Sequence, residues 1–184
     1  MNNVVRSEII DYVTYEEERN QFRSEVIALK RPRRIHVGDH LTFLFENKTT
    51  IRYQVQEMMR TEKIVKETDI LHELQTYNEL LGAPGELGCT LLIEIDDEAK
   101  RNEKLRSWLK LIHHLYMEVE GGDRVRATFD ERQVGDDRLS SVQYLKFNLD
   151  GRKPVAMGAD LAELTVHSSL SEAEVKALCE DLHE

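Results

Sequence analysis

The sequence predicts an α+β fold in which a mainly antiparallel sheet is flanked by several helices. Two observations lead to this class: helical patterns are concentrated in the N-terminal half of the chain, and strand-like runs separated by turns fill the second half. The chain has 184 residues, which is enough to bury a sizeable core. We therefore expect a single domain over residues 1–184, with a helical half at about 1–83 packed against a sheet-rich half at about 84–184.

Three helices are predicted in the first half of the chain. Thr14 and Glu17 form a capping-box pattern in front of a long first helix, which ends before Pro32 because the residue before a proline disfavours helical geometry. Apolar residues at helical spacing predict a second helix over about 49–66. A third helix is predicted over about 69–81, directly before a glycine of the kind that ends helices.

The strands are predicted from short apolar or alternating runs. RIHV and HLTFLFE, divided at Gly38, predict a hairpin, and CTLLIEID is apolar enough to be buried on both faces. A helix, EAKRNEKLRSWLKLI, follows. Four further runs, HLYMEVE, RVRATFD, SSVQYLKFNL and ELTVHS, predict an antiparallel sheet that is partly a meander. Ser171 and Glu174 then form a capping box for a final helix.

The composition limits the partners and the location that we expect. The formal net charge is −10, and an acidic surface repels phosphate groups, so neither nucleic acid nor an anionic membrane is an expected partner. Cys89 and Cys179 have no CxxC partner and predict two reduced thiols. The N-terminus lacks the pattern of a signal peptide and no apolar segment approaches membrane-spanning length, so we expect a cytoplasmic protein.

The second predicted helix carries polar side chains inside an apolar arc. At about 100° per residue, its apolar residues cover roughly two-thirds of the circumference, which is more than an ordinary surface helix needs. Thr50, Gln54, Glu57 and Thr61 fall inside this arc, whereas Gln56 is expected on the side that faces water. We therefore expect the Glu57 carboxylate to be substantially buried.

Other acidic side chains are also expected on core-facing sides. Glu73 lies beside Tyr77 on the third helix, and Glu46 and Glu94 share strand faces with apolar neighbours. The first helix adds Arg19 on its apolar arc. We therefore expect four carboxylates and at least one arginine to converge between the helices and the sheet: Glu46, Glu57, Glu73, Glu94 and Arg19.

Because a buried ionised carboxylate needs a partner, three arrangements stay open. The first is an internal network of arginines and neutral polar groups, drawn from Arg19, Arg33, Arg34, Gln54, Asn47 and Tyr77. The second is a divalent metal with Glu57 and Glu73 as candidate ligands, since oxygen-rich sites suit manganese, iron, magnesium or calcium. The third is a pocket for a cationic or hydroxylated small molecule. A di-iron bundle is disfavoured, because neither helix carries Glu-x-x-His.

The chain also resembles a known bacterial family. The segment RRIHVGDHLTFLFENKTTIRYQVQEMMRTEKI, followed by HELQTYNELL, TLLIEID and SSVQYLKF, is similar to the family called domain of unknown function 3501. The residues that match the family pattern are Glu46, Asn47, Gln54, Glu57, Arg60, Glu73, Tyr77, Asn78 and Glu94. The family carries no established activity. The resemblance implies genes beside those of rubrerythrin-like and iron–sulfur or flavin oxidoreductases, and hence a link to redox or peroxide handling.

Two functions are therefore expected, of different classes. The favoured one is a non-enzymatic accessory or assembly factor of a redox or peroxide-handling system, acting with a protein partner or as a homodimer. It predicts that the acids are neutralised internally and that an apolar patch is exposed elsewhere. The alternative is a divalent-metal or small-ligand-binding protein, or an enzyme that uses such a site, with a polar cavity reached by Glu57 and Glu73. The candidate binding residues are Glu46, Gln54, Glu57, Glu73, Tyr77, Glu94 and Arg19.

Overall fold

The computed structural model describes residues 3–183 and confirms the α+β class. Its helices and strands follow one another in this order: α1 (Tyr12–Lys30), β1 (Arg34–Val37), β2 (Leu41–Glu46), α2 (Lys48–Glu62), α3 (Glu67–Asn78), β3 (Glu86–Ile93), α4 (Glu98–Ser107), β4 (Leu115–Val119), β5 (Arg124–Arg126), β6 (Val142–Asn148), β7 (Pro154–Leu161), β8 (Leu164–Ser169) and α5 (Glu172–His183). None of the described helices combines the length and the apolar character that crossing a membrane requires.

The strands form two antiparallel sheets rather than one. Sheet A has the order β1-β2-β3-β6, and sheet B has the order β5-β4-β7-β8. The sheets approach each other along both edges, because the turn at Gly38 contacts Val166 of β8 and an isolated bridge joins Thr128 to Lys146 of β6. The inward faces of both sheets share one apolar core, which includes Phe43. We call these eight strands the sheet body.

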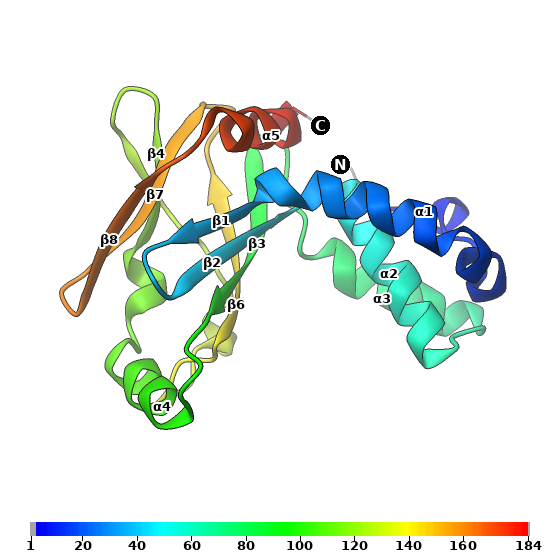
Figure 1. Ribbon diagram of the computed structural model, residues 1–184, viewed down its shortest axis with the longest axis horizontal. Coiled ribbons are helices and arrows are strands. Elements are labelled where there is room, and N and C mark those ends of the chain that lie inside the picture. Colours follow the sequence, from blue (N-terminus) through cyan, green and yellow to red (C-terminus); the bar gives the residue numbers. More distant parts are fainter. Residues whose placement is uncertain (1–2, 184) are drawn as a thin grey trace.

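The helices α1, α2 and α3 form a second structural part, which we call the helical arm. Figure 1 shows the arm extending to one side of the sheet body, with α5 and α4 at opposite edges of the sheets. The arm has its own apolar core, in which Ile51, Val55 and Met59 of α2 meet Ile70 and Leu74 of α3. The single domain predicted for residues 1–184 stays a prediction, and the two cores make it testable by unfolding.

Three chain crossings join the arm to the sheet body, and the third depends on a glycine. The crossings are residues 31–33 between α1 and β1, the step from Glu46 to Asn47, and residues 79–85 between α3 and β3. After α3 the chain lies directly on β3, where a Cβ atom at Gly88 would overlap the carbonyl oxygen of Leu80. Glycine therefore permits the arm to approach the sheet this closely.

The helix ends and one strand differ from the predictions. Asp11, not Thr14, caps α1: its carboxylate accepts the backbone N–H groups of residues 13 and 14, so Thr14 lies inside the helix. The third helix ends at Asn78 and the chain turns before residue 82. Strand β7 was not predicted, because its sequence PVAMGADL begins with a proline and is rich in Gly and Ala. The capping box at Ser171 and Glu174 is confirmed.

Candidate functional site

The carboxylate of Glu57 on α2 is bound by two side chains of α1. Arg19 donates from Nε to Oε1 at 2.7 Å and from Nη2 to Oε2 at 3.0 Å, and the Tyr15 hydroxyl donates to Oε1 at 2.6 Å. Burial acts to raise the pKa of Glu57, but the hydrogen bonds from Arg19 and Tyr15 hold that pKa below its ordinary value. The acid in the apolar arc of α2 is therefore ionised and neutralised within the chain.

A second polar cluster lies at the junction between the helical arm and the sheet body. Asp181 of α5 receives Arg33 Nε and Nη2 at 2.7 and 2.8 Å, and Asn47 Nδ2 at 3.1 Å. The side chains of Arg33 and Asp181 are each only 4% exposed, so this ion pair is excluded from water. Asn47 also caps α2 by accepting the N–H of Thr50. We call Arg33, Glu46, Asn47 and Asp181 the junction cluster.

Glu46 is the unusual member of the junction cluster. It is 6% exposed, and its one hydrogen bond is a long contact of 3.4 Å from Gln54 Nε2 to Oε1. The other oxygen, Oε2, is buried and has no hydrogen-bond partner among residues 3–183. Burial raises the pKa of the Glu46 carboxyl above its ordinary value, although the charge of Lys30 and the nearby side chains of Thr50 and Gln54 act in the opposite direction. Glu46 and Asp181 line a cavity of about 50 Å3 at this junction.

The expected convergence of four carboxylates is wrong. Glu94 lies beyond the end of β3, is exposed, and contacts Thr42 and Arg34. Glu73 is half-buried on α3 beside Tyr77. Within the described part of the chain, no three His, Cys, Asp or Glu side chains are placed to hold a metal ion together. Each acid was predicted to face the core from the pattern of its own helix or strand. The fold places these helices and strands so that the acids lie apart from one another.

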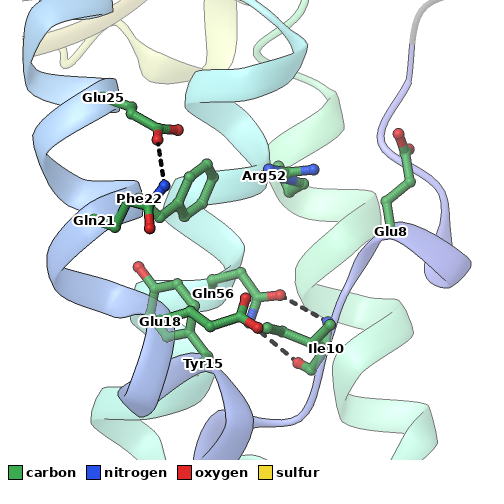
Figure 2. Close-up of a pocket in the computed structure, with 9 residues that line it drawn as sticks. All are labelled: Glu8, Ile10, Tyr15, Glu18, Gln21, Phe22, Glu25, Arg52 and Gln56. Atoms are coloured by element: carbon green, nitrogen blue, oxygen red, sulfur yellow. Dashed lines mark hydrogen bonds between the residues drawn. The ribbon is translucent and has the colours of Figure 1, made fainter.

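A polar pocket of about 410 Å3 opens between α1, α2 and the segment that precedes α1 (Figure 2). Gln56 closes one wall: its carboxamide accepts the Ile10 N–H at 2.8 Å and donates to the Ile10 carbonyl at 3.1 Å. The pocket lining combines acidic, basic and aromatic side chains: Glu8, Glu18, Glu25, Arg52, Tyr15 and Phe22. Arg52 lies 4.6 Å from the ring centre of Phe22, so its charge is already stacked against an aromatic face.

A second opening, of about 810 Å3, lies between the end of α3 and sheet A; we call it the groove. Apolar and aromatic side chains from the arm and the sheet body line it: Tyr77, Leu80, Phe129, Tyr144 and Leu145. Tyr144 is 51% exposed, which leaves a large aromatic surface open to solvent. Charged side chains also line the groove, among them Glu79, Arg132 and Lys146. A concave opening that combines apolar surface with polar groups is the usual form of a binding site.

The groove runs beside β6, the outer strand of sheet A. At Tyr144 the edge is covered by a side chain, because the N–H of Tyr144 donates to Gln133 Oε1 and its carbonyl accepts from Gln133 Nε2, both at 2.9 Å. Farther along, Lys146 exchanges both backbone hydrogen bonds with Thr128, at 2.8 Å each. The Gln133 carboxamide thus takes the place that a neighbouring strand would occupy.

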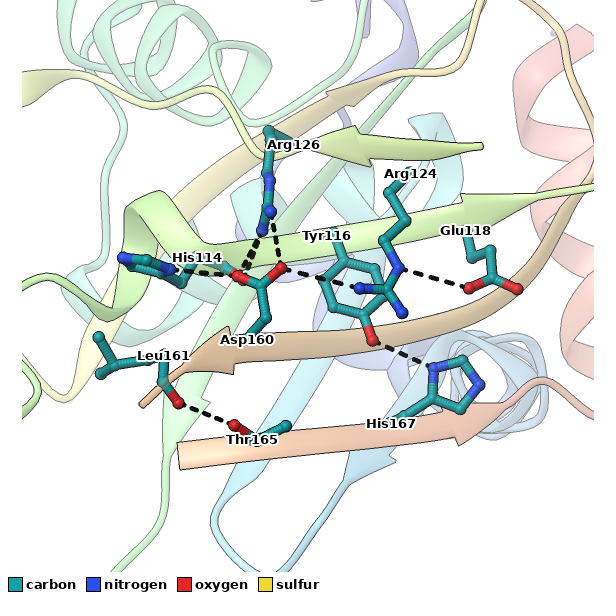
Figure 3. A network of polar contacts seen from close by, with 9 residues as sticks. All are labelled: His114, Tyr116, Glu118, Arg124, Arg126, Asp160, Leu161, Thr165 and His167. Carbon is teal, nitrogen blue, oxygen red and sulfur yellow. Dashed lines mark hydrogen bonds and ion pairs between the residues drawn. The ribbon is translucent and has the colours of Figure 1, made fainter. Parts of the chain in front are cut away.

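A polar network covers the outer face of sheet B (Figure 3). Arg126 donates to both carboxylate oxygens of Asp160, at 2.8 and 2.6 Å, and His114 Nδ1 lies 3.1 Å from Oδ1. The Arg126 hydrogen bonds lower the pKa of Asp160 to about 2. Arg124 lies 4.1 Å from the ring centre of Tyr116. These charges pair with one another across the strands, which is typical of a stabilised surface.

Sequence reasoning missed two residues that matter at these sites. Gln56 was expected to face water, but it is 2% exposed because the segment before α1 folds across α2 and meets it. Asp181 was not singled out, although it balances Arg33. No local pattern marks Asp181, because its partner lies 148 residues away in the sequence. Arg19 and Glu57 are the pair that the helical periodicities do bring together.

Comparisons with known proteins place the chain among proteins of unassigned role. The family model described as "Protein of unknown function (DUF3501)" matches residues 3–182. The crystal structure of a novel protein of unknown function from Burkholderia pseudomallei K96243 is similar, with a TM-score of 0.88 and 30% sequence identity; the match covers 99% of this chain and 100% of that chain. None of the curated proteins matches the chain.

Proposed function

We propose a function for a chain that belongs to the DUF3501 family of proteins of unknown function, and we base it on the groove. The protein is a non-enzymatic accessory or assembly factor that holds an extended segment of a partner protein between α3 and β6. One observation carries this proposal. The aromatic surface of the groove lies beside the edge of β6, and at Tyr144 the side chain of Gln133 binds that edge in place of a neighbouring strand. Extended segments bind strand edges by main-chain hydrogen bonds and side-chain pockets, and here a bound segment replaces the Gln133 carboxamide at the N–H and carbonyl of Tyr144.

The state of the acidic side chains supports a non-enzymatic role. Arg19 and Tyr15 neutralise Glu57, and Arg33 neutralises Asp181, so these groups already have partners in the free protein. A catalytic acid or base is instead expected in an open cleft with a pKa moved towards its working pH. The accessory role with an internal network is therefore the better account of Glu57.

The kind of partner follows from the family resemblance. That resemblance implies neighbouring genes for rubrerythrin-like and iron–sulfur or flavin oxidoreductases, so a component of such a redox or peroxide-handling system is the proposed partner. The groove takes one of its segments, and the neighbouring Leu80 and Phe129 provide apolar contact. A cytoplasmic location is part of this proposal, because such redox systems work there.

Site-specific crosslinking in the native host tests the proposal. A photoreactive phenylalanine analogue replaces Tyr144 in the groove and, as a matched control, Val13, an exposed apolar residue of α1 outside the groove. After irradiation, we expect one discrete protein adduct at position 144 and none at position 13. The captured protein is then purified, and its affinity for the wild type is compared with that for Leu80→Glu, which places a charge in the groove.

We expect Leu80→Glu to weaken binding by about tenfold or more, because a buried contact at the centre of an interface carries much of the affinity. Equal crosslinking at both positions would contradict a specific groove. So would equal affinity of the purified partner for the wild type and Leu80→Glu. If the captured partner acts outside redox or peroxide metabolism, the groove remains the proposed binding site, but the proposed link to a redox or peroxide-handling system is rejected.

Small-ligand binding is the second candidate function, and the pocket between α1 and α2 favours it. Its acidic side chains, Glu18 and Glu25, suit a small organic cation. Thermal melts with added spermidine or putrescine test this role, because a ligand that binds the folded state raises the melting temperature by mass action. We expect the shift to shrink in Glu18→Gln and to persist in Glu103→Gln, which lies on α4 outside this pocket. No shift in the wild type would remove this candidate.

A further inference from the structure

Glu46 stands at the point where the two cores meet. It is the last residue of β2, whose apolar neighbours belong to the core of the sheet body, and the next residue, Asn47, caps α2 of the helical arm. Asn47 also ties the start of the arm to α5 through its hydrogen bond to Asp181. A change at Glu46 therefore acts directly on one of the three chain crossings.

The carboxyl of Glu46 lacks the partners that an ionised group needs. It is 6% exposed, and within the described part of the chain Oε2 has no hydrogen-bond donor. The cavity of about 50 Å3 beside it is lined by both polar and apolar residues and has room for ordered water. An unpaired carboxylate at such a place favours either protonation or hydration, because charge is poorly stabilised away from water.

The charged groups around Glu46 belong to four neighbouring elements, α1, α2, β3 and α5. Lys30 at the end of α1 favours the ionised form, and Asp181 of α5 opposes it. Lys48 of α2 and Glu86 of β3 line the same cavity, but Lys48 is engaged with Glu8 at 3.0 Å.

Two further groups face the junction. Arg33 from residues 31–33 is already committed to Asp181 by two hydrogen bonds. Cys89 of β3 is buried, and burial together with the nearby charge of Glu46 raises its pKa, so the thiol adds no charge. Among the described residues no cation forms an ion pair with Glu46, and Lys30 acts on it only through its charge at longer range.

We propose that Glu46 binds and releases a proton, and that this proton sets the position of the helical arm on the sheet body. Neutral Glu46 fits the close junction seen in the structure. Ionised Glu46 draws water into the cavity beside Asn47 and loosens the contact between Asn47 and Asp181. Because the groove has one wall on α3 and the other on β6, movement of the arm changes the width of the groove. The inference does not depend on what the groove binds.

The direction of the pH effect follows from burial. Since burial raises the pKa of Glu46 above its ordinary value of 4.5, the folded protein keeps this proton at a pH where a solvated glutamate has lost it. The close junction is therefore favoured at low pH. As the pH rises through the pKa of the folded protein, the arm loosens.

Distance measurements between two spin labels test this proposal. Thr61 at the end of the arm and Glu163 in the turn between β7 and β8 are exposed, so cysteines at these positions carry the labels. Cys179→Ser removes the native thiol that is partly accessible, and buried Cys89 remains unlabelled. The distance distribution is recorded from about pH 5 to about pH 9, the range in which buried glutamates titrate.

We expect the distance to change in one single-proton transition. Glu46→Gln, a neutral side chain of the same shape, should keep the low-pH distance throughout, and Glu86→Gln, from the same cavity, should retain the transition. A constant distance in the wild type would overturn the proposal, as would an unchanged transition in Glu46→Gln. If Glu46→Gln does not fold, the carboxyl carbon of Glu46 is titrated by NMR in the wild type; a midpoint different from that of the distance change overturns the proposal equally.

Discussion

Removal of the charge of Asp181 should destabilise the protein more than any exposed ion pair would. In Asp181→Asn the shape of the side chain remains, but Arg33, whose side chain is 4% exposed, loses its counter-charge. Leaving one partner of a buried pair uncompensated costs about 3–5 kcal/mol in free energy of unfolding. For a chain of this length that corresponds to a fall in melting temperature of roughly 6–20 °C, at about 2–4 °C per kcal/mol.

Urea unfolding followed by circular dichroism measures this cost, with a double-mutant cycle as its control. The cycle consists of Arg33→Met, Asp181→Leu and the variant that carries both substitutions. The double variant removes both charges, and we expect it to be more stable than either single variant, because no unpaired charge remains. A cost below about 1 kcal/mol for Asp181→Asn, the value typical of exposed pairs, would refute the reasoning. So would a double variant whose loss equals the sum of the two single losses.

Three further predictions concern the arm, its attachment and the outer face of sheet B. Glu57→Gln should lower the free energy of unfolding by about 1–3 kcal/mol in urea titrations, because it removes charge-assisted hydrogen bonds; a variant as stable as the wild type would contradict the internal network. Gly88→Ala should lower the free energy of unfolding by about 3 kcal/mol or more, because the added Cβ overlaps the carbonyl oxygen of Leu80. Thermal melts measure this loss, and an unchanged melting temperature would refute the close approach of the two segments. Asp160 has a pKa of about 2 when folded and an ordinary value of 3.8, so the stability it contributes is present above pH 3.8 and disappears as the pH falls through about 2. Acid titrations of Asp160→Asn should lack this component.

Local periodicity predicted much of the fold. The helix α2 and the β1–β2 hairpin arise from patterns that are complete within one short segment, and both are confirmed. The pairing of Arg19 with Glu57 could also be anticipated, because each lies within the apolar arc of its own helix and such arcs face one another when two helices pack. The prediction of an internal network for Glu57 came from the same reasoning.

The other features of the fold and the site depend on contacts between residues far apart in the sequence, which no local pattern predicts. Gln56 is buried because the segment before α1 crosses α2, and Arg33 is balanced by Asp181 from the last helix. Strand β7 escaped prediction because its Gly and Ala residues suit close packing between β4 and β8 rather than intrinsic strand preference. The expected convergence of Glu46 and Glu94 failed because a shared strand face does not bring residues at different strand positions together.

The metal content of the purified protein tests most directly whether the carboxylate of Glu57 belongs to an internal network or to a ligand site. Protein prepared without an affinity tag or chelator is analysed by mass spectrometry and then melted with added manganese, ferrous iron or magnesium. We predict metal far below one equivalent and no upward shift of the melting temperature, because Arg19 and Tyr15 already satisfy Glu57. Near-stoichiometric metal, or a melt raised by mass action, would contradict this account.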